Sequence, residues 1–112
     1  MEPSYTAVAL VTLTPAWLRM DRAQRQDFTD THIVPLLTRY SSRVTMRYVD
    51  VEAFTGRCSE MLIFTTADPA DFAALWDELR DTPLFADGLM HVEDIIVGLD
   101  AGWTNTATSA AA

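Results

Sequence analysis

The sequence has little of several residue types, and each shortage excludes a class of function. Its 112 residues include one cysteine, Cys58, so no internal disulfide can form and a reducing cytoplasm is the expected compartment. Only four glycines occur, and they form neither of the Gly-rich nucleotide-binding loops. No apolar run reaches the roughly 18 residues that cross a bilayer, so no membrane association is expected. Residues 1–4 lack the basic and apolar pattern of a secretory signal.

Lysine is absent, and acidic residues outnumber the basic ones. All 8 basic residues are arginines, and they stand against 16 acids for a net charge of −8. Because phosphate binding needs surplus positive charge, the composition argues against a nucleic-acid partner. Residues 1–58 carry a net charge of +1 and residues 59–112 carry −9. This asymmetry indicates either a solvated acidic face or two surfaces that complement each other across a subunit interface.

What the sequence does contain is the composition of one globular domain. Hydrophobic residues make up 49% of the chain and charged residues 21%. A chain of this length is typical of a single domain with a core of its own. We expect that domain to cover residues 1–103, followed by a flexible tail over residues 104–112, where few side chains are large enough to bury.

The hydrophobic pattern predicts four strands and two main helices. The strands are expected at residues 5–14, 43–51, 60–66 and 90–99. Asp21 is placed to cap the first main helix, in which Pro35 should distort the backbone near Thr31. Thr14 is expected to cap a short turn before that helix. Asp68 precedes a proline and should cap the second helix, which Asp81-Thr82-Pro83 ends.

The order strand, helix, strand, strand, helix, strand predicts an α+β fold of the ferredoxin-like βαββαβ type. Two crossovers and one hairpin give a four-stranded antiparallel sheet with both helices on one face. The other face is expected to be apolar, through Val8, Leu10, Val49, Leu62, Phe64 and Ile95. Monomers rarely expose so large a patch, so we expect a homodimer of the dimeric α/β-barrel type with a small-molecule ligand between its layers.

Several stretches resemble the darcynin family of small bacterial proteins. The resemblance is carried by residues 47–54, by Arg57-Cys58-Ser59-Glu60, by residues 78–85 and by Asp94-Ile95-Ile96. Residues 5–7 and 14–18 are also similar, so the likeness spans about residues 5–103. It implies a compact bacterial α+β domain, and since the family's function is unassigned it supplies no catalytic residues.

Motifs for metal or nucleophilic chemistry are weak. His32 and His91 are the only histidines, and neither belongs to a metal-binding pattern, so no metal and no cofactor are expected. Cys58 follows Arg57, which would favour a thiolate, but a buried and inert thiol is the simpler interpretation. Asp50 and Arg57 flank the predicted hairpin, where an ion pair between them would stabilise the turn.

Arg47 is the strongest candidate for ligand binding. If Met46 and Tyr48 pack against the helices, alternation turns Arg47 toward the open face, whereas a slip of one residue exchanges it with Tyr48. An arginine between two sheets needs an anion nearby. That anion is either a carboxylate of the protein, Glu93 or Asp94, or a ligand that Arg47 clamps.

His91 and Glu93 lie two residues apart on the last strand and therefore share a face. Such a pair can transfer a proton near neutral pH, with Glu93 orienting the imidazole, whereas the simpler interpretation is a solvated sheet edge. Arg47, His91 and Glu93 are thus the predicted catalytic residues. The predicted ligand contacts are Thr12, Tyr48, Phe64 and Trp103.

Three functions remain open from the sequence. The first is a small cofactor-independent enzyme, a cyclase, isomerase or oxygenase acting on a compact aromatic or keto-acid metabolite, and it rests on analogy at the level of the fold. The second is a non-catalytic dimer that binds a small molecule or serves as an accessory protein. The third is a structural dimer whose interior is filled by its own side chains.

Overall fold

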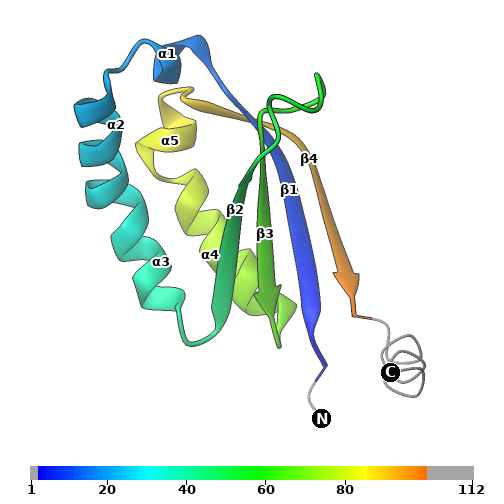
Figure 1. The fold of residues 1–112 in the computed structure, drawn as a ribbon. Helices are drawn as coiled ribbons and strands as arrows, with labels where there is room; N and C mark the ends of the chain where they lie inside the picture. Colours follow the sequence, from blue (N-terminus) through cyan, green and yellow to red (C-terminus); the bar gives the residue numbers. More distant parts are fainter. Residues whose placement is uncertain (1–2, 101–112) are drawn as a thin grey trace.

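The computed structural model describes residues 3–100 and shows a sheet covered on one face by helices (Figure 1). The strands are β1 (Tyr5–Leu13), β2 (Val44–Asp50), β3 (Glu60–Thr66) and β4 (Met90–Leu99). The sheet has the order β2-β3-β1-β4 and all neighbours are antiparallel. The ferredoxin-like fold predicted from the sequence is therefore confirmed. Trp103 and the predicted tail lie outside the described residues.

The helical layer contains more pieces than the sequence predicted. It consists of α1 (Pro15–Leu18), α2 (Arg22–Phe28), η1 (Thr29–Ile33), α3 (Val34–Tyr40), α4 (Pro69–Arg80) and α5 (Pro83–Ala86). The turn α5 was not predicted, since the sequence indicated only where α4 ends. Gly88, at φ +67°, then turns the chain from α5 into β4. No helix of the described residues is long and apolar enough to cross a membrane.

Helix capping explains where the two main helices begin. Asp21 and Gln24 form a reciprocal capping box at α2, and Asp68 accepts from the backbone N–H of Ala70 at α4, both as predicted. Thr14 differs: its hydroxyl does not cap α1 but donates to the carbonyl of Gly88 at 2.6 Å. This hydrogen bond connects the end of β1 to the segment that leads into β4.

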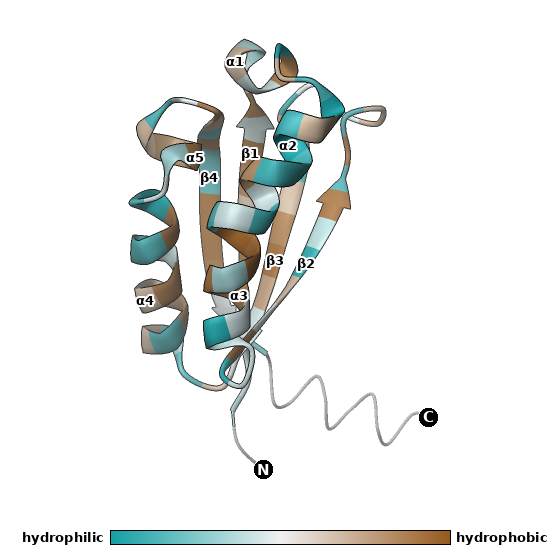
Figure 2. Cartoon of the chain, turned by 90° about the vertical axis from the view of Figure 1, so that its left-hand side faces the viewer, coloured by the Kyte–Doolittle hydropathy of each residue, from teal (hydrophilic) through white to brown (hydrophobic). Residues whose placement is uncertain are grey.

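The segment η1 is a π-helical turn between α2 and α3. It lies where Pro35 was predicted to distort the helix, near Thr31. Pro35 has no N–H to donate toward Thr31, and its ring crowds the turn that precedes it. A widened turn removes that clash without ending the helix, so α2, η1 and α3 continue along the sheet (Figure 2).

The core fills the space between the helices and the sheet. Alternate residues of β1 and β3 point into it, among them Ala9, Val11 and Phe64, all of which are fully buried. Phe64 contacts Phe72 and Trp76 of α4, at ring-centre distances of 5.0 and 6.2 Å. Small residues on β1 leave room for these rings, which fix α4 against the sheet.

Candidate functional site

A cavity of about 340 Å³ lies between the helical layer and the sheet. It is enclosed by residues of every layer: Leu13, Trp17, Thr29, Ile33, Val34, Leu37, Met46, Tyr48, Leu62, Leu79, Leu84 and Met90. All of these side chains except Thr29 are apolar or aromatic, and the volume lies at the lower end of the range for small-molecule sites. The cavity is thus suited to a compact, largely apolar molecule.

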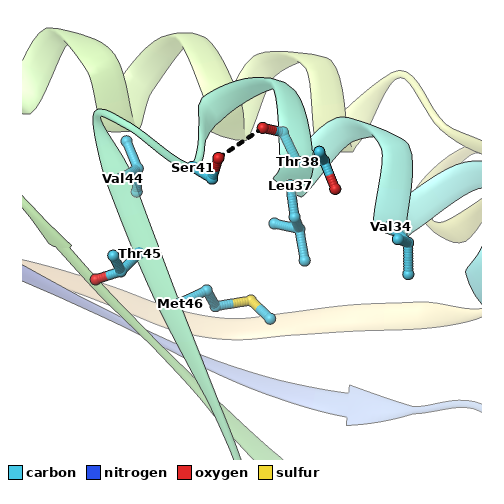
Figure 3. Close-up of a pocket in the computed structure, with 7 residues that line it drawn as sticks. All are labelled: Val34, Leu37, Thr38, Ser41, Val44, Thr45 and Met46. Atoms are coloured by element: carbon cyan, nitrogen blue, oxygen red, sulfur yellow. Dashed lines mark hydrogen bonds between the residues drawn. The ribbon is translucent and has the colours of Figure 1, made fainter.

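The π-helical turn shapes the wall of this cavity. Thr29 and Ile33 come from η1, and Val34 and Leu37 come from the start of α3. Leu37 points from α3 toward Met46 of β2, where the cavity adjoins a shallow groove (Figure 3). π-helical turns are frequent at functional sites, and here the turn supplies part of the cavity wall.

The polar end of the cavity is formed by Tyr48. Partial burial and the neighbouring carboxylates of Glu60, Asp50 and Glu52 raise the pKa of Tyr48 well above its ordinary value. The hydroxyl therefore stays protonated across the physiological range. It can act as a hydrogen-bond donor or acceptor, but not as a base near neutral pH.

The opposite face of the sheet carries no helix (Figure 1). Strand register places one row of side chains across it, formed by Arg47, Ile63, Val8 and Ile96 in order from β2 to β4. The next row is Val49, Met61, Leu10 and Asp94. The middle of this open face is therefore apolar, while a positive charge stands on one edge strand and a negative charge on the other.

Arg47 lies on the open face, as predicted. Met46 packs against the core and Tyr48 lines the cavity, so alternation turns Arg47 away from the helices. Arg47 and Asp94 sit on opposite edge strands, about 14 Å apart by strand spacing. Within one protomer, the predicted approach of Arg47 to Glu93 or Asp94 therefore does not occur.

His91 and Glu93 lie together on β4. His91 Nε2 is 3.8 Å from Glu93 Oε1, and the His91 side chain is 69% exposed. The register between β1 and β4 shifts here, since Val11 faces Val92 while Leu10 faces Asp94. Glu93 is the extra residue of this β-bulge, which turns it and Asp94 toward the same face. Thr12 lies directly opposite His91 and shares that face.

Phe64 is the clearest error among the predicted contacts. It was expected on the open face with Leu62 and Ile95, but all three face the helices, and Phe64 is completely buried in the aromatic core. Tyr48 also lies on the helix side, so it does not share a face with Arg47. The predicted ligand contacts therefore divide between the two faces, and Trp103 lies outside the described residues.

Two smaller predictions have different outcomes. Cys58 is a buried free cysteine, as the simpler interpretation held. Within residues 3–100, the ion pair between Asp50 and Arg57 is not formed, and Asp50 instead accepts from the backbone N–H of Glu52 at 3.1 Å. The acid stabilises the turn through an Asx-type hydrogen bond rather than through charge.

The cavity residues Trp17, Ile33, Leu37 and Met46 were not singled out in the sequence. Apolar residues at helical or alternating spacing predict a core, and the pattern is the same whether they fill the core or line a hollow in it. The one signal was Pro35, which marks the position of the widened turn but not the cavity beside it.

Comparison with known proteins places this geometry in context. The family model for Darcynin, described as a domain of unknown function, matches residues 1–112. A darcynin homologue of Streptomyces avermitilis is 33% identical over 105 residues, which cover 94% of this chain and 86% of the relative. A darcynin of Chromobacterium violaceum is 39% identical over 69 residues, covering 62% of this chain and 86% of the relative.

Solved structures with the same fold are much more distant in sequence. A haem-binding protein from Thermus thermophilus superposes with a TM-score of 0.81 at 13% identity, over 96% of this chain and 44% of that protein. A mutant chlorite dismutase from Candidatus Nitrospira defluvii gives 0.79 at 12% identity, over 94% and 43%. The chain thus spans less than half the length of these proteins, and the likeness supports the fold alone.

Proposed function

The chain belongs to the darcynin family, and from that premise we propose that it is a small-molecule-binding protein whose ligand occupies the cavity between the helices and the sheet. The observation that carries the proposal is the apolar cavity of about 340 Å³ with Tyr48 at its polar end. A well-packed domain of this size has few voids larger than a water molecule. A compact aromatic molecule with one polar group matches the lining.

Haem, named for one structural neighbour, does not fit the cavity. The cavity is too small for the haem macrocycle, and neither histidine of the chain lines it. His32 packs against Phe28 with tilted rings at a ring-centre distance of 4.8 Å and lines a depression on the helical surface, while His91 lies on the open face. The proximal histidine that holds haem in many proteins therefore has no counterpart in the cavity wall.

The proposal is tested by a thermal shift measurement with indole and 4-ethylphenol as probes. A ligand at about 100 times its Kd stabilises the folded state by about 2.7 kcal/mol. Leu37→Trp should fill the cavity and remove the shift. Ile96→Trp, which adds the same side chain to the exposed open face, should leave the shift unchanged. A shift that survives Leu37→Trp overturns the proposal.

A second candidate function places the ligand on the open face of a homodimer. Two copies could pack with their open faces together about a two-fold axis parallel to the strands. This axis places β2 of one copy over β4 of the other and so brings Arg47 near Asp94 of the partner subunit. A two-fold axis perpendicular to the strands would instead place β2 over β2, where the like charges of the two arginines repel. Arg47 would then bind an anionic substrate, and the His91–Glu93 pair would transfer its proton. The apolar middle of the face supports this arrangement.

Light scattering tests the second candidate. Arg47→Glu should dissociate the dimer, and adding Asp94→Arg should restore it. Arg22→Glu, on the exposed surface of α2, makes the same change of charge and should have no effect. A wild-type protein that is monomeric at about 100 μM, well above the Kd of most stable homodimers, contradicts this candidate.

A further inference from the structure

Three carboxylates converge at the end of the sheet where β2 passes into the loop that leads to β3 (Figure 1). One oxygen from each of Asp50, Glu52 and Glu60 lies within 4.8 Å of the other two. Asp50 and Glu60 are direct partners in the antiparallel pairing. Like charges directly opposite each other destabilise a strand pair, so this arrangement needs a compensating charge.

Glu60 makes the arrangement more than a cluster of surface acids. The residue is 3% exposed, and its Oε2 atom is buried without a hydrogen-bond partner. A buried carboxylate oxygen that has lost its water and found no donor is costly. The Tyr48 hydroxyl lies close enough to hydrogen-bond to the Glu60 side chain, yet Oε2 keeps no partner. Since the same side chain converges with two other carboxylates, the missing partner of Oε2 is most simply a cation.

No basic side chain neutralises the cluster within residues 3–100. The ion pairs there join Arg39 to Glu78, Arg43 to Asp71 and His91 to Glu93. Within the described residues the Asp50 carboxylate accepts one hydrogen bond, from the backbone N–H of Glu52, which fixes Oδ1 and leaves Oδ2 available. The three residues thus offer oxygen atoms alone.

We propose that Asp50, Glu52 and Glu60 bind a calcium ion. Hard divalent cations take oxygen ligands, and Ca²⁺ does so at about 2.3–2.6 Å. Oxygens on opposite sides of a calcium ion are up to about 5 Å apart, so three oxygens that all lie within 4.8 Å of one another can share one ion. Mg²⁺ keeps several of its waters and is usually held by one or two carboxylates, so a site of three protein carboxylates favours Ca²⁺. Two of the ligands are exposed, so water completes the coordination shell.

This site is distinct from the proposed ligand cavity, although Tyr48 lies beside both. The cavity depends on apolar side chains of the helices, and the cation site depends on three acids at the tip of the sheet. Bound calcium would tie the loop after β2 to the start of β3. The site adds a metal-binding function to the proposed one, and each can fail without the other.

Isothermal titration of chelator-treated protein with calcium chloride tests the proposal. We expect one calcium ion to bind and the binding to saturate below about 10 mM calcium, a concentration tenfold above the dissociation constant of the weakest protein calcium sites. Magnesium chloride should bind at least about tenfold more weakly, since Mg²⁺ gives up its waters reluctantly and demands a strict octahedral geometry. Absence of calcium binding, or tighter binding of magnesium, overturns the assignment.

Two variants and a control locate the ion. Glu60→Gln should abolish calcium binding, and Asp50→Asn, at an exposed position where folding is not at risk, should weaken it at least about tenfold. Asp27→Asn removes the same charge from the exposed surface of α2 and should bind as the wild type does. Unchanged binding in Asp50→Asn, or equal loss in Asp27→Asn, shows that the ion is held elsewhere and overturns the proposal.

Discussion

Replacing Glu60 by glutamine should stabilise the cation-free protein, although it alters a buried residue. Substitutions of buried residues usually lower the free energy of unfolding, whereas this one is expected to raise it. Glutamine keeps the shape of glutamate and removes its charge. Its amide can also donate to Asp50, which stands directly opposite in the strand pair.

The size of the effect follows from the geometry of the carboxylates. Two unit charges at most 4.8 Å apart repel by at least about 0.9 kcal/mol at the dielectric constant of water and by at least about 3.5 kcal/mol at an effective value of 20. Glu60 takes part in two such pairs, and since Asp50 and Glu52 are exposed we use the lower figure, about 2 kcal/mol in all. The unpartnered oxygen of Glu60 adds about 1 kcal/mol or more.

Urea unfolding at neutral pH with a chelator measures this gain. Glu60→Gln should raise the free energy of unfolding by at least about 2 kcal/mol, while the control Asp27→Asn stays within about 0.5 kcal/mol of the wild type. The gain should shrink in about 1 M salt, where the Debye length falls to about 3 Å. A variant less stable than the wild type would refute the reasoning, because Glu60 would then have a stabilising partner.

Two further predictions concern the core and the helical surface. Phe64→Ala should cost about 3–5 kcal/mol in urea unfolding, since the ring is fully buried, and a loss below about 1 kcal/mol would contradict its placement. The Tyr40 hydroxyl and Arg39 donate to Glu78 and lower the pKa of that carboxyl. Because the pKa of Glu78 is lower in the folded state than in the unfolded state, its charge stabilises the fold at every pH above the unfolded-state pKa. That stabilisation is lost as the pH falls through the folded-state pKa. The stability difference between wild type and Glu78→Gln, measured by urea unfolding from neutral to acid pH, should therefore disappear in acid, and a difference independent of pH would exclude the charge as its cause.

Local signals in the sequence were sufficient for the four strands, the two main helices and their order, although not for the turn α5. Alternation and helical spacing located the strands and the main helices, and Asp21 and Asp68 marked helix starts because capping is decided by a few neighbouring residues. Pro35 indicated a distorted turn for the same local reason. Chain connectivity then restricted the topology to the ferredoxin-like arrangement.

The faces of the strands were less certain, because parity depends on pairing between distant segments. Arg47 was placed correctly, since polar and apolar residues alternate clearly on β2. Phe64 was not, because β3 is largely apolar on both faces and its sequence does not show which face the helices cover.

The fold class, the starts of the two main helices and a distortion near Thr31 could be predicted from the amino-acid sequence alone, because they depend on neighbours along the chain. Three relations could be seen only in the folded protein: Leu37 and Met46 border a cavity, Arg47 and Asp94 occupy opposite edges of the sheet, and Glu60 meets Asp50 and Glu52. Those relations join residues from different elements. They depend on strand register and on how the helices pack against the sheet, and local sequence patterns predict neither.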